Sequence, residues 1–129
     1  MRYAFILYAG KTVSFKRVEY DLIGDVSKRL DWVKEQIGCE WVEVVNLPRF
    51  IENSCLLIDE EGLINTENPE LNYIGSVLYG TPQHGSPIVG NALLCTTQYV
   101  GDGYDTVGFD VDTAAEVEKL LKSMQAEAK

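Results

Sequence analysis

The stretch YAFILYAGKTVSFKRV, residues 3–18, decides the fold class because it predicts two strands joined by a turn. Residues 3–9 are a continuous apolar and aromatic run, which is typical of a central strand. Gly10 marks a turn, and residues 12–18 then alternate between apolar and polar side chains with the period of a strand. The chain is therefore predicted to begin with a β-hairpin.

A helix is predicted directly after this hairpin, over residues 25–37. Asp25 is suited to cap its N-terminus, and Gly38 stands where a helix commonly ends. The apolar side chains of this segment recur at helical spacing and form one stripe, which consists of Val26, Leu30, Val33 and Ile37.

The rest of the chain adds strands without regular helical crossovers between them. Asn68-Pro69 is predicted to open a short helix that ends at about Tyr79, because Asn caps helices and Pro suits the first turn. Thr113 and Glu116 form a capping-box pattern for a C-terminal helix. Strand patterns occupy residues 40–47, 55–58, 88–97 and 104–109.

This order of elements predicts an α+β fold for residues 1–129 as a single domain. We expect a mostly antiparallel sheet of five to six strands with two longer helices and one short helix. Residues 100–129 are expected to form a C-terminal extension that carries the terminal helix.

The net charge of −9 is unevenly distributed along the chain. Residues 1–49 carry eight basic and seven acidic side chains, whereas residues 50–129 carry three basic and thirteen acidic ones. Residues 50–118 contain no Lys or Arg. A surface of this sign repels nucleic acid, which argues against direct binding of DNA or RNA. The acidity either attracts a basic partner or only keeps the protein soluble.

The cysteines and the hydropathy pattern indicate a cytoplasmic protein without a metal site or a cofactor. Cys39, Cys55 and Cys95 are an odd number without a CxxC pair, so reduced, buried thiols are expected. One His and scattered Cys do not supply the four closely spaced ligands of a zinc site. No window reaches the length of a membrane-spanning helix, and the short apolar run at the N-terminus is better explained as a strand.

Catalytic patterns are weak throughout the chain. His84 is the single imidazole and Ser86 lies near it, but no nucleophile elbow is present, so a surface-loop His is the better interpretation. The adjacent carboxylates of residues 59–61 are expected to face water rather than to converge on a substrate. We therefore assign no catalytic residue, and a small hydrolase that uses His84 stays the least favoured alternative.

Side-chain amides are concentrated between residues 58 and 95, and they suggest a binding pocket. Amides offer donors and acceptors without charge, which suits a base or sugar edge, and a tyrosine ring could stack on a base. The alternative is that Asn68 caps a helix, Asn72 is exposed and Asn91 bonds to loop backbone. The candidate ligand-binding residues are Asn68, Asn72, Tyr73, Tyr79, Gly90, Asn91 and His84, with Lys16 and Arg17, or Lys28 and Arg29, as phosphate contacts.

Several blocks resemble an uncharacterised family of small domains that is common in bacteriophages and bacterial mobile elements. They are LIDEEG at residues 57–62, Asn68-Pro69, SVLYG at residues 76–80 and PIVGNALL at residues 87–94. IGCEWVEV at residues 37–44 fits a further pattern of that family, with Cys39 where a second Gly is usual. The resemblance covers roughly residues 1–100. It implies a setting among accessory genes, often near anti-restriction functions, and it implies no catalytic residue.

The leading hypothesis is a non-enzymatic phage-type accessory protein that acts against host defence by sequestering a small nucleotide-like signal, with a homo-oligomer possible. The alternative partner is a host defence protein, whose nucleic-acid surface the acidic chain would occupy as a decoy.

Overall fold

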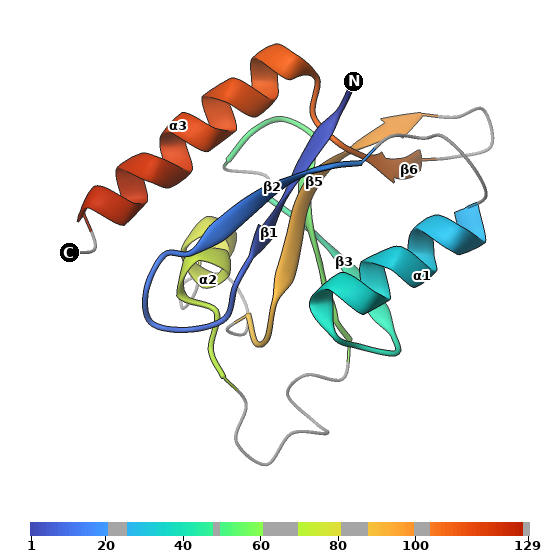
Figure 1. The fold of residues 1–129 in the computed structure, drawn as a ribbon, viewed down its shortest axis with the longest axis horizontal. Coiled ribbons are helices and arrows are strands. Elements are labelled where there is room, and N and C mark those ends of the chain that lie inside the picture. The colour runs from blue at the N-terminus through green and yellow to red at the C-terminus, as the bar shows by residue number, and fades with distance from the viewer. Residues whose placement is uncertain (21–25, 48–49, 61–69, 81–87, 100–103, 128–129) are drawn as a thin grey trace.

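The computed structural model describes residues 1–20, 26–47, 50–60, 70–80, 88–99 and 104–127. Figure 1 shows how the elements of these ranges are arranged. Their order is β1 (Tyr3–Leu7), β2 (Phe15–Glu19), α1 (Val26–Ile37), β3 (Val42–Asn46), β4 (Ser54–Asp59), α2 (Tyr73–Tyr79), β5 (Ala92–Tyr99), β6 (Tyr104–Val107) and α3 (Val111–Glu127).

The described strands form one six-stranded sheet in which every paired neighbour is antiparallel. The strand order is β2-β1-β5-β4-β3, and β6 pairs with the end of β5 on the side where β1 lies. The hairpin predicted from residues 3–18 is confirmed, with Leu7 opposite Phe15. The α+β class, the antiparallel sheet and the division into two longer helices and one short helix are confirmed as well.

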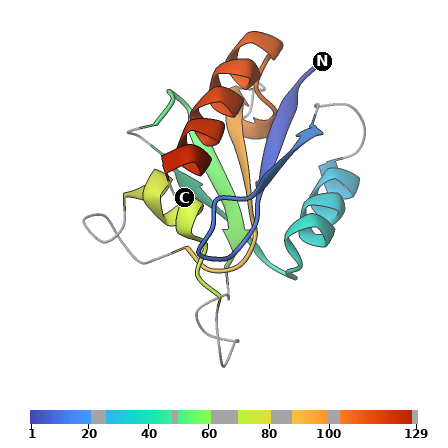
Figure 2. The same cartoon turned by 60° about the vertical axis from the view of Figure 1, so that its left-hand side comes forward.

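Helices cover both faces of the sheet. In Figure 2, α2 and α3 lie on one face and α1 lies on the other. The alternation of side chains along β1 explains both contacts, because Phe5 and Leu7 join the core under α2 and α3, while Ala4 and Ile6 join the core under α1. In the ranges described, no helix combines the length and the apolar character that crossing a membrane requires.

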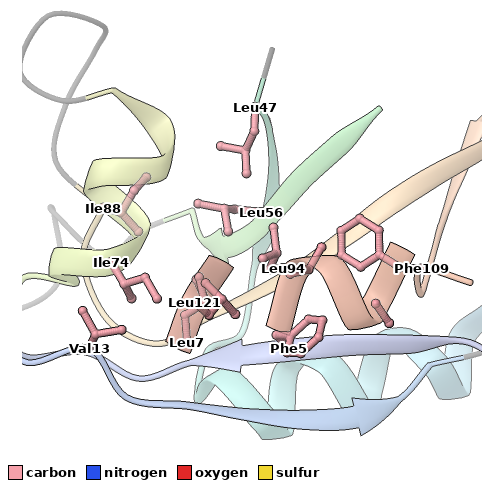
Figure 3. Close-up of a cluster of buried hydrophobic side chains, with 13 residues drawn as sticks. Phe5, Leu7, Val13, Leu47, Leu56, Ile74, Ile88, Leu94, Phe109 and Leu121 are labelled. Atoms are coloured by element: carbon pink, nitrogen blue, oxygen red, sulfur yellow. The ribbon is translucent and has the colours of Figure 1, made fainter. Parts of the chain in front are cut away.

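The larger core lies between the sheet and the pair of helices α2 and α3 (Figure 3). Phe5 is fully buried there, and its ring contacts those of Phe15 and Phe109 at centroid distances of 6.1 and 6.4 Å. Aliphatic side chains from the sheet, from α2 and α3 and from the segments next to them fill the remaining space, among them Leu7, Leu47, Leu56, Ile74, Ile88, Leu94, Val117 and Leu121.

Residues 104–127 contribute to the sheet and to this core. Tyr3 and Phe109 exchange two backbone hydrogen bonds, of 2.9 and 2.7 Å, and Gly108 N donates to Tyr20 O at 2.7 Å. A Cβ on Gly108 would lie only 2.6 Å from the backbone nitrogen of Tyr3 and 2.7 Å from the carbonyl oxygen of Tyr20. The backbone of Gly108 therefore packs directly against the backbone of Tyr3 and Tyr20, and only glycine fits at this position.

Two predicted helix starts are wrong. The short helix begins at Tyr73 with Asn72 as its cap, because Leu71 pairs with Val89 in a β-bridge instead of entering the helix. The predicted opening at Asn68-Pro69 lies outside the described residues. The C-terminal helix begins at Val111, two residues before the expected Thr113 cap, since Asp110 Oδ1 accepts the N–H of Thr113 at 2.8 Å. That hydrogen bond lowers the pKa of Asp110.

The expected apolar stripe of α1 is only partly buried. Val33 and Ile37 lie in the core under α1, but the side chain of Leu30 is 42% exposed. Trp32, which lies off the stripe, is half-buried and stacks on Tyr20 at a centroid distance of 5.7 Å. The buried face of α1 is therefore rotated toward Tyr20, and Leu30 is left at the border of an open groove.

Candidate functional site

Asn72 is fully buried at the N-terminus of α2, and its amide is used within the protein. Its Oδ1 accepts the N–H of Gly75 at 2.8 Å, while its Nδ2 donates to the carbonyls of Leu7 and Gly90, both at 2.9 Å. The alternative that placed Asn72 on the surface is thus wrong. Because both amide protons and the oxygen have partners, this side chain joins α2 to β1 and to the segment before β5.

Asn91 and Gly90, which lie next to Asn72, also serve the fold and not a ligand site. Asn91 Oδ1 accepts the backbone N–H of Ala9 at 2.8 Å, as the alternative interpretation of this residue expected. Gly90 has φ +76°, and nothing lies within 4 Å of the position that a Cβ would take. Glycine is favoured at this position by the positive φ of the backbone and not by the close approach of another group.

The remaining predicted binding residues do not complete a pocket with these amides. Tyr73 is largely exposed, and Tyr79 packs against the core under α2 and α3. Lys16 and Arg17 are exposed on β2, where the guanidinium of Arg17 lies over the ring of Tyr3 at 4.7 Å. Asn68 and His84 lie outside the described residues. Of the described candidates, the two amides therefore bind backbone instead of lining a cavity.

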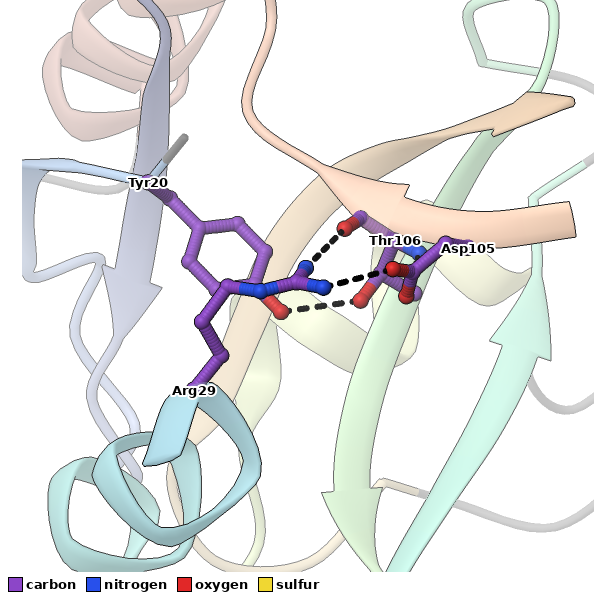
Figure 4. A network of polar contacts seen from close by, with 4 residues as sticks. All are labelled: Tyr20, Arg29, Asp105 and Thr106. Carbon is purple, nitrogen blue, oxygen red and sulfur yellow. Dashed lines mark hydrogen bonds and ion pairs between the residues drawn. The ribbon is translucent and has the colours of Figure 1, made fainter. Parts of the chain in front are cut away.

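A polar network that the sequence did not indicate lies on the α1 face of the sheet (Figure 4). Arg29 of α1 donates to Asp105 Oδ2 at 2.7 Å and to the carbonyl of Thr106 at 3.3 Å, and its side chain is only 12% exposed. The hydroxyls of Tyr20 and Thr106 are hydrogen-bonded at 2.8 Å. Burial raises the pKa of Tyr20, so this ring stays neutral.

The network forms one wall of a groove between α1, β3 and β6. The groove consists of two adjoining cavities of about 240 and 600 Å³, and Val44, Asp105 and Thr106 line both of them. Apolar side chains of α1 and of the sheet line the smaller cavity, whereas amides and hydroxyls contribute to the larger one, including those of Asn46, Asn53, Ser54 and Thr97. We call this concavity the α1 groove.

The outer edge of β3 borders the α1 groove and is open in the described structure. On its inner side Trp41 O accepts the N–H of Glu60, and Leu47 N donates to Ser54 O. Residues that bond to the partner strand alternate along an antiparallel ladder. The backbone N–H and C=O groups of the intervening residues therefore point away from β4, and these residues are Val42, Val44 and Asn46.

Apolar and acidic side chains surround this open edge. Trp41 is 57% exposed and Val44 is 49% exposed. The Lys34 ammonium lies 5.9 Å from the centre of the Trp41 ring. Five carboxylates lie before and within β3, in the connection to β4, and at and directly after the end of β4, namely Glu40, Glu43, Glu52, Asp59 and Glu60. The opposite edge of the sheet, β2, carries Lys16 and Arg17, so the two edges differ in charge.

Part of this arrangement could have been found in the sequence. The strand predicted at residues 40–47 contains two Glu and ends at Pro48, and charged residues and Pro are typical of edge strands. The Arg29–Asp105 pair carries no local signal, because its members are separated by 76 residues. Burial of the cysteines is confirmed for Cys55 and Cys95, whose sulfurs are 3.7 Å apart, whereas Cys39 is half-buried.

Neither metal ligation nor similarity to known proteins adds to this site. Among the described residues, no cluster of three or more His, Cys, Asp or Glu side chains could hold a metal ion. No protein-family model matches the chain, and no similar curated protein or solved structure was found. The resemblance to a phage-associated family therefore stays a prediction, and the site is interpreted from its own chemistry.

Proposed function

We propose that the protein is a non-enzymatic binding protein whose acidic β3 edge attaches to a basic surface of another protein. The observation that carries this proposal is the set of five carboxylates in and next to β3 and β4, beside a strand whose outer edge is open in the described part of the chain. Carboxylates arranged in this way attract a cationic partner and exclude nucleic acid from the same surface. The two described amides of the predicted pocket, those of Asn72 and Asn91, are by contrast engaged with backbone.

A nucleic-acid-binding surface of a defence protein is the partner that fits this chemistry. Such surfaces present Lys and Arg along the phosphate track, so an acidic protein that covers them competes with DNA or RNA. The resemblance to a family of phages and mobile elements supports the same setting. The protein would then act as a decoy, without turnover and without a cofactor.

Charge reversal at the β3 edge is expected to weaken binding to a basic DNA-binding domain by at least about tenfold at low salt. The variant combines Glu43→Lys with Glu60→Lys, and the control combines Asp112→Lys with Glu116→Lys on α3, which changes the net charge equally. Fluorescence anisotropy over a series of salt concentrations measures both, and unlabelled duplex DNA should displace the wild-type protein. Equal weakening by the two variants, or no binding to a panel of such domains, would contradict the proposal.

A second candidate function is capture of a small nucleotide-like molecule in the α1 groove. The groove favours it because its larger cavity, about 600 Å³, is lined by the amide residues Asn46 and Asn53 and by the apolar side chain of Val44. The recognition chemistry is that expected of the amide stretch, but it is supplied by other residues.

A saturating cyclic or ADP-ribose-derived nucleotide is expected to raise the melting temperature by about 3 °C or more if this second function holds. Asn53→Gly should abolish the shift, because it removes the amide while glycine tolerates the φ of +64° at this position. Differential scanning fluorimetry across a nucleotide panel makes the measurement. A panel without any shift would remove this candidate and leave the protein partner.

A further inference from the structure

We infer that the β3 edge takes an extended, basic segment of the partner by strand addition, so that the partner becomes the next strand of the sheet. This inference rests on the proposed function and specifies how the partner is held. The backbone supplies the first argument, since Val42, Val44 and Asn46 direct their N–H and C=O groups outward. An unpaired row of this kind is a template for a further strand.

The apolar side chains beside the edge supply the second argument. An added strand would place every second side chain on the α1 face, against Val44 and the half-exposed Leu30. Val33 and Leu57 line the same cavity and are buried. The edge therefore offers a row of hydrogen-bonding groups next to a shallow apolar surface, which is how strand addition combines affinity with side-chain selection.

The comparison with the other edge of the sheet supplies the third argument. Natural sheets protect edge strands with charged side chains, most often Lys. β2 has three charged side chains among its five residues, Lys16, Arg17 and Glu19, whereas β3 has only Glu43. Within the strand itself β3 therefore has fewer charged side chains than β2 and no Lys or Arg, so an added strand meets fewer charges there.

Charge complementarity defines the occupant as basic. The edge, open in the described part of the chain, has five carboxylates in and next to β3 and β4, and the ammonium of Lys34 lies 5.9 Å from the centre of the Trp41 ring. A strand that alternates apolar and basic residues would set the apolar ones toward the α1 groove and the basic ones toward Glu43. A second copy of β3 fits less well, because it would bring a second set of carboxylates to the same edge.

The test uses a fluorescent peptide of alternating Lys and Val, together with the same peptide N-methylated at every second residue. Methylation on the bonding edge removes the main-chain donors and leaves the charge unchanged. We expect methylation of the residues whose N–H groups face β3 to weaken binding at least about tenfold. Methylation of the alternate residues, whose N–H groups face away from β3, should have little effect. A block peptide of equal composition, with all Lys before all Val, should bind more weakly than the alternating one.

On the protein side, Val44→Pro is the matching variant. It removes the outward N–H of Val44 and keeps an apolar side chain, and Pro is tolerated on an edge strand when its nitrogen faces outward. Val44→Ala, which keeps the N–H, is the control, and the melting temperatures of both variants verify that they fold. We expect Val44→Pro to lose peptide binding at least about tenfold and Val44→Ala to lose clearly less.

The outcomes separate this inference from the proposed function. If methylated and unmethylated peptides bind equally but charge reversal at Glu43 and Glu60 still abolishes binding, strand addition is wrong and the acidic surface stands. If charge reversal has no effect either, both are wrong. If the free protein forms a dimer that Val44→Pro dissociates, as measured by analytical ultracentrifugation, the occupant is a second copy and the inference is overturned.

Discussion

Replacing Gly108 by alanine is expected to destabilise the protein by about 3 kcal/mol, a large part of the stability of a domain of this size. The new Cβ would lie 2.6 Å from the backbone nitrogen of Tyr3 and 2.7 Å from the carbonyl oxygen of Tyr20. Both atoms take part in backbone hydrogen bonds, Tyr3 N to Phe109 O and Tyr20 O from Gly108 N, so neither can move without breaking one of these bonds. Urea unfolding followed by tryptophan fluorescence measures the loss.

Gly38→Ala is the control for Gly108→Ala. Gly38 has φ +71° after the end of α1, but nothing lies within 4 Å of its potential Cβ. Alanine there is expected to cost about 1 kcal/mol, through backbone strain alone. If the two substitutions cost the same, the packing of Gly108 against Tyr3 does not hold the sheet together.

Replacing Asn72 by alanine is expected to cost about 3–4 kcal/mol without affecting the acidic edge. The substitution removes the cap of α2 and leaves the carbonyls of Leu7 and Gly90 without the donors they have in the buried site. Three segments that are distant in sequence lose their connection at once. Chemical denaturation gives the free energy of unfolding, and anisotropy with the basic domain verifies that binding by the folded protein is unchanged.

Asn72→Ser separates the two parts of this effect. A serine oxygen can accept the N–H of Gly75 as a helix cap, but it cannot reach both carbonyls. We therefore expect it to recover about 1 kcal/mol of the loss and no more. A variant as stable as the wild type would show that the two carbonyl contacts contribute nothing to stability. Loss of partner binding by a folded variant would show that Asn72 takes part in binding.

The strands and the helix periods could be predicted because each is a local pattern. The apolar run of residues 3–9 and the alternation after it already contain the hairpin. The choice between Asn68 and Asn72 as helix cap was beyond local reasoning, because both precede apolar residues at helical spacing. The structure assigns the cap to Asn72, which also bonds to Leu7 and Gly90, and no spacing rule contains contacts across such distances.

The candidate site was less accessible for the same reason. Exposure of Leu30 depends on which part of the sheet α1 covers, and the periodicity of the helix alone does not contain that information. The openness of β3 depends on the strand order, which places β5 between β1 and β4. The uneven charge between the two halves of the chain was visible from the start. The five carboxylates near β3 come from both halves, however, so the charge of this edge became evident only with the strand order.

The position of β5 in the middle of the sheet has a consequence for synthesis on the ribosome. β1 can pair with β5, and Tyr3 with Phe109, only after those later segments have been synthesised. The sheet therefore depends on contacts between segments that are far apart in sequence. High contact order of this kind slows folding and delays it until the chain has been synthesised past Phe109. Until then the nascent chain exposes the apolar residues of β1 and β4, and we expect it to depend on chaperones more than a helical protein of equal length.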